Sequence, residues 1–134
     1  MSVLRCELMQ VRAEQDIVAV RHEVRSWAVT LGLSIVDQTK IVTAASELAR
    51  NTLRYGGGGT ARLEALQEGN RSGLRLTFED SGPGIADVGL ALTDGYTTGG
   101  GLGLGLSGSK RLVNEFDIWS MPGEGTRVTV TRWR

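Results

Sequence analysis

The sequence has 134 residues, a length that suits one domain of ordinary size, and we expect residues 1–134 to form a single domain. Its 15 lysine and arginine residues balance 15 aspartate and glutamate residues, so no overall charge favours nucleic acid, an anionic membrane or an acidic substrate. The single cysteine, Cys6, cannot form an internal disulfide, the first residues are too polar for a secretory signal, and no apolar run approaches the length of about 18 residues needed to span a membrane. We therefore expect a cytoplasmic protein without a membrane span.

The first third of the chain predicts a strand followed by two helices. Residues 3–11 partly alternate between apolar and polar side chains, as a strand does. Apolar residues then recur at helical spacing from Asp16, a candidate N-cap, to Gly32, which stands where a C-terminal glycine belongs. A second apolar stripe runs from the candidate cap Ser34 to Tyr55, and the four glycines that follow end this helix.

The middle of the chain predicts a β-hairpin. Residues 61–65 and 74–78 both alternate strictly between apolar and polar side chains. The intervening residues 69–73 contain two glycines and an asparagine and form a good hairpin loop, so we expect the two strands to be antiparallel.

Glycine is concentrated after this hairpin. The chain has 19 glycines, about 14% of its residues against a usual value of about 7%, and ten of them lie between Gly82 and Gly108. Beyond the glycine-rich stretch we expect a helix, a strand, a turn and a final strand, over residues 107–115, 116–120, 121–125 and 126–133. This order favours an α+β two-layer sandwich, in which helices cover one face of a mixed, mainly antiparallel sheet.

Asp80 follows the second strand of the hairpin and is in phase with its apolar residues. Strand alternation therefore points Asp80 toward the helix-covered face, where a carboxylate needs a partner. Two interpretations remain open. Either the strand ends at Glu79 and Asp80 only opens a turn over residues 80–84, or Asp80 is a buried acceptor for an N–H group of a ligand.

Glu47 and Asn51 are four residues apart on the second predicted helix and therefore share one of its faces. A carboxylate followed one turn later by a carboxamide is common on solvated helices. The functional alternative is a general base beside an amide oxygen that ligates Mg²⁺, a cation that prefers oxygen ligands.

Residues 97–107 form a glycine-rich loop that runs directly into a helix. Glycines allow close backbone approach, and the N–H groups at a helix start attract anions, which together suit phosphate binding. Residues 103–108 match G-x-G-x-x-G but no strand precedes them, and neither Lys40 nor Lys110 has the spacing of a Walker A lysine. The alternative is an exposed connecting loop, although its alternating leucines need somewhere to pack.

The sequence offers few residues for a catalytic triad, a metal site or nucleic-acid binding. His22 is the only histidine, so neither a Ser-His-Asp triad nor a His/Cys metal site is expected. Arg132 and Arg134 make too small a basic patch to indicate nucleic-acid binding.

Four short segments, taken in order and with their spacing, resemble the N, G1, G2 and final threonine motifs of the GHKL ATPases. They are ELARN at 47–51, DSGPG at 80–84, GLGLG at 101–105 and GT at 125–126. The resemblance spans nearly the whole chain and implies the Bergerat fold. The chain is too short for the further domains of gyrase, Hsp90 or sensor histidine kinases, so within this family it is most similar to the anti-sigma-factor-type serine/threonine kinases, and among them to the stressosome switch kinases.

The resemblance implies an ATP site with assigned roles. Glu47 would accept the proton of a substrate hydroxyl, and Asn51 would hold the Mg²⁺ that bridges the ATP phosphates. Asp80, helped by Thr126, would accept a hydrogen bond from the adenine amino group. Five glycines would bring the backbone close to the nucleotide: Gly82 and Gly84 at the base, and Gly101, Gly103 and Gly105 at the phosphates. Lys110 would be a weaker contact to the phosphates.

The same resemblance implies protein partners. The phosphorylated substrate would be a STAS-domain protein of the RsbS type on a stressosome scaffold, and the released kinase would activate a PP2C-type phosphatase of the RsbU type. Two alternatives stay open: an anti-sigma factor that binds a sigma subunit directly, and a non-catalytic binding module whose conformation nucleotide controls.

Overall fold

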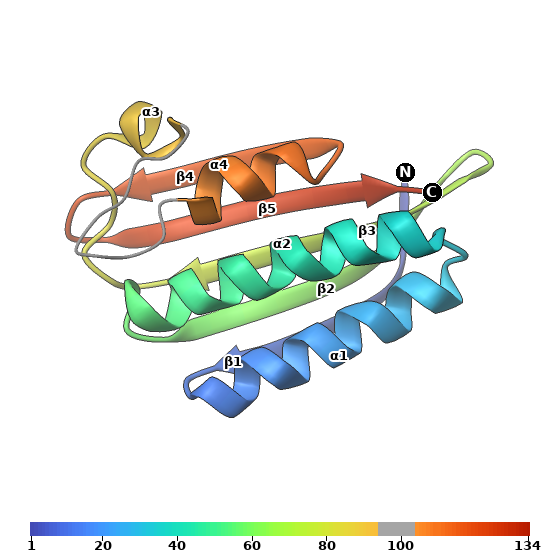
Figure 1. Ribbon diagram of the computed structural model, residues 1–134, viewed down its shortest axis with the longest axis horizontal. Helices are drawn as coiled ribbons and strands as arrows, with labels where there is room; N and C mark the ends of the chain where they lie inside the picture. The colour runs from blue at the N-terminus through green and yellow to red at the C-terminus, as the bar shows by residue number, and fades with distance from the viewer. Residues whose placement is uncertain (94–103) are drawn as a thin grey trace.

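A five-stranded antiparallel sheet with helices on one face makes up the computed structural model, which describes residues 1–93 and 104–134 (Figure 1). The sheet order is β1-β2-β3-β5-β4. The strands are β1 Ser2–Val11, β2 Gly59–Glu68, β3 Arg71–Asp80, β4 Glu115–Met121 and β5 Gly125–Trp133. The helices are α1 Glu14–Thr30, α2 Ile35–Arg54, α3 Val88–Ala91 and α4 Leu104–Arg111. The α+β sandwich expected from the sequence is confirmed, and all four strand pairings in the described residues are antiparallel.

The core lies between the sheet and the helices α1 and α2. Figure 1 shows these helices lying across the same face of the sheet, with α4 beside α2. Apolar side chains from both layers are fully buried there, among them Trp27, Ile41, Leu48, Leu63, Leu74, Leu76 and Val130. This packing fixes α2 in the middle of the helical layer. In the part of the chain that the structure describes, no helix has the length and apolar character needed to cross a membrane.

The hairpin between β2 and β3 is tighter than the predicted loop over residues 69–73. Strand pairing continues to Glu68 opposite Arg71, so only Gly69 and Asn70 connect the strands. Gly69 has a φ of 59°, the left-handed conformation that a two-residue hairpin turn requires. The predicted loop is too long because Gly73, a residue type common in turns, lies in β3 opposite Trp133.

The N-cap of α1 lies three residues before the predicted cap, Asp16, and the helix begins at Glu14. Ala13 is the N-cap residue, and the Asp16 carboxylate accepts hydrogen bonds from the backbone amides of Arg12 (2.8 Å) and Ala13 (3.1 Å). Asp16 therefore reaches back from inside the first turn, where an acidic side chain also interacts favourably with the helix dipole. The predicted cap of α2 is confirmed, since the Ser34 hydroxyl accepts a hydrogen bond from the backbone amide of Asp37 (3.1 Å).

The bounds predicted for α4 were wrong at both ends. The helix occupies Leu104–Arg111 and stops before residues 112–115 because Asn114 is tied to the neighbouring strand. The Asn114 backbone amide donates to the carbonyl of Thr131 (2.9 Å), and its side-chain oxygen accepts from the amide of Trp133 (2.6 Å). The short helix α3 was not predicted; the Asp87 carboxylate caps it by accepting from the amide of Leu90 (2.9 Å).

An ion pair joins the start of α2 to the end of β5. A guanidinium nitrogen of Arg132 lies 2.6 Å from a carboxylate oxygen of Asp37, and the hydrogen bond from Arg132 holds the pKa of Asp37 below its ordinary value of 3.8. A carboxyl group whose pKa is lowered by folding stabilises the fold above its unfolded pKa, and this contribution is lost as the pH falls through the folded pKa.

We expect Asp37→Asn to lower the free energy of unfolding by about 1 kcal/mol at pH 7, because the partly buried guanidinium of Arg132 loses its charged partner. The difference from wild type should shrink as the pH is lowered below 3.8, the ordinary pKa of this carboxyl group. Urea unfolding measured at a series of pH values checks this expectation. A difference that stays constant over the whole series would show that the charge of Asp37 is not what stabilises this end of α2.

Candidate functional site

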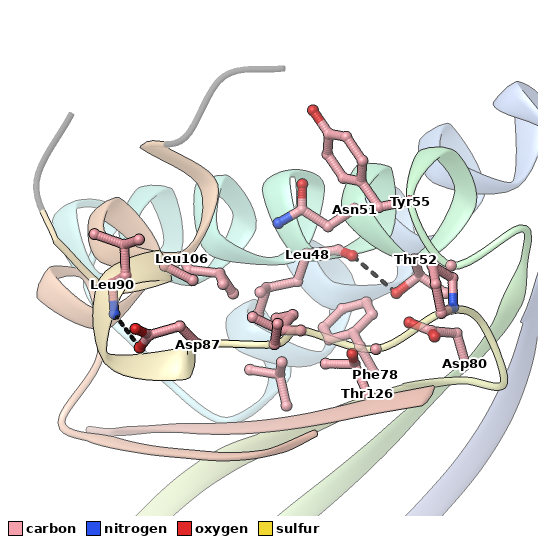
Figure 2. A pocket seen from close by; sticks show the side chains of 17 residues that line it. Leu48, Asn51, Thr52, Tyr55, Phe78, Asp80, Asp87, Leu90, Leu106 and Thr126 are labelled. Carbon is pink, nitrogen blue, oxygen red and sulfur yellow. Dashed lines mark hydrogen bonds between the residues drawn. The ribbon is translucent and has the colours of Figure 1, made fainter. Parts of the chain in front are cut away.

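A cavity of about 500 Å³ opens between α2 on one side and the ends of β3 and β5 on the other, close to α3 and the start of α4 (Figure 2). Its walls are mostly apolar, with contributions from Leu48, Phe78, Ile85, Leu90, Leu106 and Val128. Six polar side chains also line it, namely Asn51, Thr52, Tyr55, Asp80, Asp87 and Thr126. A largely apolar pocket with a few convergent polar groups is the usual form of a small-ligand site.

Asp80 is the last residue of β3 and lies on the sheet side of this cavity. The strand includes Asp80, which pairs with Thr126 on β5, so the alternation that directed its side chain toward the helical layer holds to the end. One carboxylate oxygen accepts a hydrogen bond from the amide of Gly82 (2.9 Å). Burial raises the pKa of Asp80, and hydrogen bonds from the backbone amides of Gly82 and Thr126 offset part of the rise.

Two glycines let the backbone pack closely, one against this carboxylate and one in the loop that follows it. A Cβ atom on Gly56, just after α2, would overlap the carboxyl group of Asp80. Gly84 has a φ of 77°, and a Cβ there would overlap the backbone carbonyl of Met121. The loop after β3 is further tied down because the amide of Gly123 donates to the carbonyl of Pro83 (2.8 Å). The residues around Asp80 thus form a fixed cradle of backbone.

Helix α2 supplies the opposite rim. Figure 2 shows Asn51 and Tyr55 projecting from α2 on the side of the cavity away from Asp80 and Thr126. Glu47, one turn before Asn51, is about 29% exposed and forms an ion pair with Arg50 at 2.8 Å. The two residues predicted to act together therefore lie on one helix, with the amide at the cavity and the carboxylate just outside its lining.

The remaining predicted site residues lie in different places. Gly82 contacts Asp80 through its amide, whereas Gly101 and Gly103 fall outside the described residues. Gly105 is in the first turn of α4, not in a loop, and Leu106 beside it lines the cavity. Lys110 lies exposed in the last turn of α4, about 6 Å further along the helix axis than Leu106, and is not part of the cavity lining.

Sequence reasoning missed two hydroxyl groups at the site. Thr52 is buried on the face of α2 that lines the cavity, and its hydroxyl donates to the carbonyl of Leu48 (2.9 Å). Ser120 on β4 lies behind Thr126, with 2.9 Å between their hydroxyl oxygens. Thr52 follows Leu48 by four residues and therefore shares its face of α2, so helical spacing alone could have identified it. Ser120 becomes visible only once β4 and β5 are paired, with Ser120 opposite Thr126.

The arrangement suits a flat, amino-bearing ring with a polar tail. A carboxylate at the sheet side of an apolar pocket can accept from a ligand N–H group, and the polar rim of α2 leads out of the pocket. The described residues contain no cluster of three or more histidine, cysteine, aspartate or glutamate side chains that could hold a metal. A Mg²⁺ ion here would therefore depend on few protein ligands, such as the amide oxygen of Asn51, and on phosphate oxygens, which is a common mode for this ion.

Residues 36–133 match the family model described as "Histidine kinase-, DNA gyrase B-, and HSP90-like ATPase". The chain belongs to this family of ATP-binding domains. It is 45% identical over 125 residues to the serine/threonine-protein kinase RsbT of Bacillus subtilis (strain 168), which covers 93% of this chain and 94% of that protein. The family and the kinase class expected from the sequence are thus confirmed, and the chain is an RsbT-like serine/threonine-protein kinase.

More distant relatives share the same architecture. The chain is 28% identical over 133 residues to an anti-sigma F factor of Thermoanaerobacter sp. (strain X514), covering 95% of this chain and 92% of that protein. The crystal structure of the RsbU and RsbW domains of Rv1364c from Mycobacterium tuberculosis superposes with a TM-score of 0.65 at 22% identity, over 97% of this chain and 33% of that one. The SiaB-SiaC complex from Pseudomonas aeruginosa gives a TM-score of 0.54 at 13% identity, over 98% of this chain and 91% of that one. The two structures support the fold.

Proposed function

We propose that this kinase binds ATP with Mg²⁺ in the cavity beside α2 and transfers the terminal phosphoryl group to a serine or threonine of a STAS-domain protein. The observation that carries the proposal is the arrangement across the cavity. Asp80 lies on the sheet side, where it can accept from the base, and Asn51 lies at the opposite rim on α2, with Glu47 one turn before it on the same helix. This arrangement occurs in a chain that is 45% identical to a named serine/threonine kinase.

Each residue has a role that its position supports. Asp80 accepts a hydrogen bond from the adenine amino group, while Leu48 and Phe78 pack against the ring. The amide oxygen of Asn51 ligates Mg²⁺, which when bound neutralises charge on the phosphate oxygens. Glu47 accepts the proton of the substrate hydroxyl as the hydroxyl oxygen bonds to the terminal phosphorus and the bond to the bridging oxygen of ADP breaks.

The partner-switch role follows from what a phosphate does at a packed interface. It adds about −1.5 to −2 charges, which costs desolvation and repulsion wherever no cation is placed to meet it. We propose that the kinase binds its RsbS-like substrate on the stressosome scaffold, leaves when that substrate is phosphorylated, and then activates an RsbU-like PP2C phosphatase. This pathway places the protein in the cytoplasm.

Labelled ATP added to the kinase with Mg²⁺ and purified STAS-domain proteins tests the proposal. Label that appears on serine or threonine of one STAS protein, and that depends on Mg²⁺, supports it. Binding of ATP without transfer to any STAS protein would favour a nucleotide-gated binding module instead.

The similarity to an anti-sigma F factor gives the second candidate, an anti-sigma factor that binds a sigma subunit directly. A pull-down with both kinds of partner separates the two functions. Stoichiometric capture of a sigma subunit would overturn the switch role, and capture of a STAS protein that is released when ATP is added would support it.

A further inference from the structure

Ser120 on β4 makes three hydrogen bonds that together join the loop after β3 to the hairpin between β4 and β5. Its hydroxyl oxygen lies 2.7 Å from the backbone nitrogen of Ile85, 2.9 Å from the carbonyl oxygen of Gly125 and 2.9 Å from the hydroxyl oxygen of Thr126. Of these partners, Ile85 and Thr126 line the cavity, and Ser120 itself lies behind them.

The chemistry of the partners fixes the direction of these bonds. A hydroxyl group has one proton and two lone pairs. The carbonyl of Gly125 can only accept, so the Ser120 hydroxyl donates its proton to that hydrogen bond. The amide of Ile85 can only donate, so it occupies one lone pair of the Ser120 oxygen. The remaining lone pair of Ser120 must accept the third bond, which makes Thr126 the donor.

Thr126 then has no proton left for the cavity. Its hydroxyl oxygen still carries lone pairs and therefore acts toward a ligand, or toward a water between them, only as an acceptor. Asp80, the residue paired with Thr126 on the neighbouring strand, is also an acceptor when ionised. Figure 2 shows Thr126 and Asp80 on the same, sheet side of the cavity.

We propose that Ser120 is a positioning residue for base specificity, which orients the Thr126 hydroxyl as an acceptor and so favours a purine with a 6-amino group over one with a 6-keto group. The inference rests on the proposed binding of ATP in this cavity. An amino group offers two donors to the pair of acceptors, whereas the 6-keto form presents an acceptor oxygen at the same place and has only its N1–H to donate, so at least one of the two acceptors stays unpaired.

The test measures the ratio of ITP to ATP dissociation constants with Mg²⁺, because inosine carries a 6-keto group and a protonated N1 where adenosine carries a 6-amino group and an unprotonated N1. In Ser120→Ala the Thr126 hydroxyl is free to rotate and donate to the keto oxygen. We expect this ratio to fall by about 5- to 10-fold, the effect of one hydrogen bond. Ser120→Thr keeps the hydroxyl and should keep the wild-type ratio.

A double-mutant cycle separates orientation of Thr126 from general support of the loop. Thr126→Val should weaken the binding of ATP and leave the binding of ITP little changed. Adding Ser120→Ala to this variant should not lower the ratio of ITP to ATP dissociation constants further. Equal weakening of both nucleotides by Ser120→Ala, or the same fall of the ratio in the Thr126→Val background, would overturn the inference. Thr126→Val alone also decides the matter if Ser120→Ala does not fold, because a larger loss for ITP than for ATP would mean that Thr126 donates. If the wild-type protein bound neither nucleotide, the proposed function itself would be overturned.

Discussion

Glu47→Gln is expected to slow phosphate transfer to the protein substrate by about 10²- to 10⁴-fold, which is the range for loss of a general base. Affinity for ATP should change little, because Glu47 lies outside the lining of the cavity while Asn51, one turn further along α2, is part of it. Single-turnover transfer of labelled phosphate measures the first quantity, and calorimetric titration with ATP and Mg²⁺ measures the second.

Asp37→Asn is a matched control for this substitution. It removes the same charge from the same helix, about 15 Å along the axis from Glu47 and at the end away from the cavity. The control should transfer phosphate at a rate close to that of wild type at a temperature where both variants are folded. Transfer by Glu47→Gln at the rate of the control would assign Glu47 to its ion pair with Arg50 and would exclude it as the base.

The fold was largely predictable because its signals are local. Strict alternation in β2 and β3 and the apolar stripes of α1 and α2 need no knowledge of the rest of the chain. The errors lie where a distant residue decides the outcome. Helix α4 ends early because Asn114 bonds to β5, a contact that joins residues far apart in the sequence and has no local pattern.

The residues of the candidate site also divide into those that local spacing predicts and those that depend on distant contacts. Glu47, Asn51 and Asp80 could be predicted as candidates because helical and strand periodicity determine which face each occupies. Ser120 was not found because its importance depends on the register that sets it opposite Thr126 and on the loop that brings Ile85 to it. Spacing identifies residues on one element, whereas hydrogen bonds between three segments require the assembled fold.

Asp80→Asn is expected to weaken ATP binding by about 10- to 100-fold, since it replaces a charged acceptor and turns a donor toward the adenine amino group. The same change should raise the free energy of unfolding at pH 7, because the wild-type fold keeps a partly desolvated carboxylate at this position. Calorimetry with ATP measures the first effect, and urea unfolding without nucleotide measures the second.

The pH dependence follows from the direction of the shift. Burial raises the pKa of Asp80 above its ordinary value of 3.8, so folding favours the protonated group. The stability that this provides is complete below the unfolded pKa and is lost as the pH rises through the folded pKa. The stability advantage of Asp80→Asn should therefore be largest near neutral pH and should shrink as the pH is lowered toward 3.8.

Asp87→Asn distinguishes a ligand contact from the loss of any carboxylate in the cavity. Asp87 also lines the cavity, but its carboxylate caps α3, a task that asparagine performs about as well. This control should bind ATP nearly as wild type does and should gain no stability. If Asp80→Asn also bound ATP normally, Asp80 would be only a turn residue held by the amide of Gly82. A substitution that strengthens the fold and removes binding would instead indicate that the carboxylate is kept for the ligand at a cost in stability.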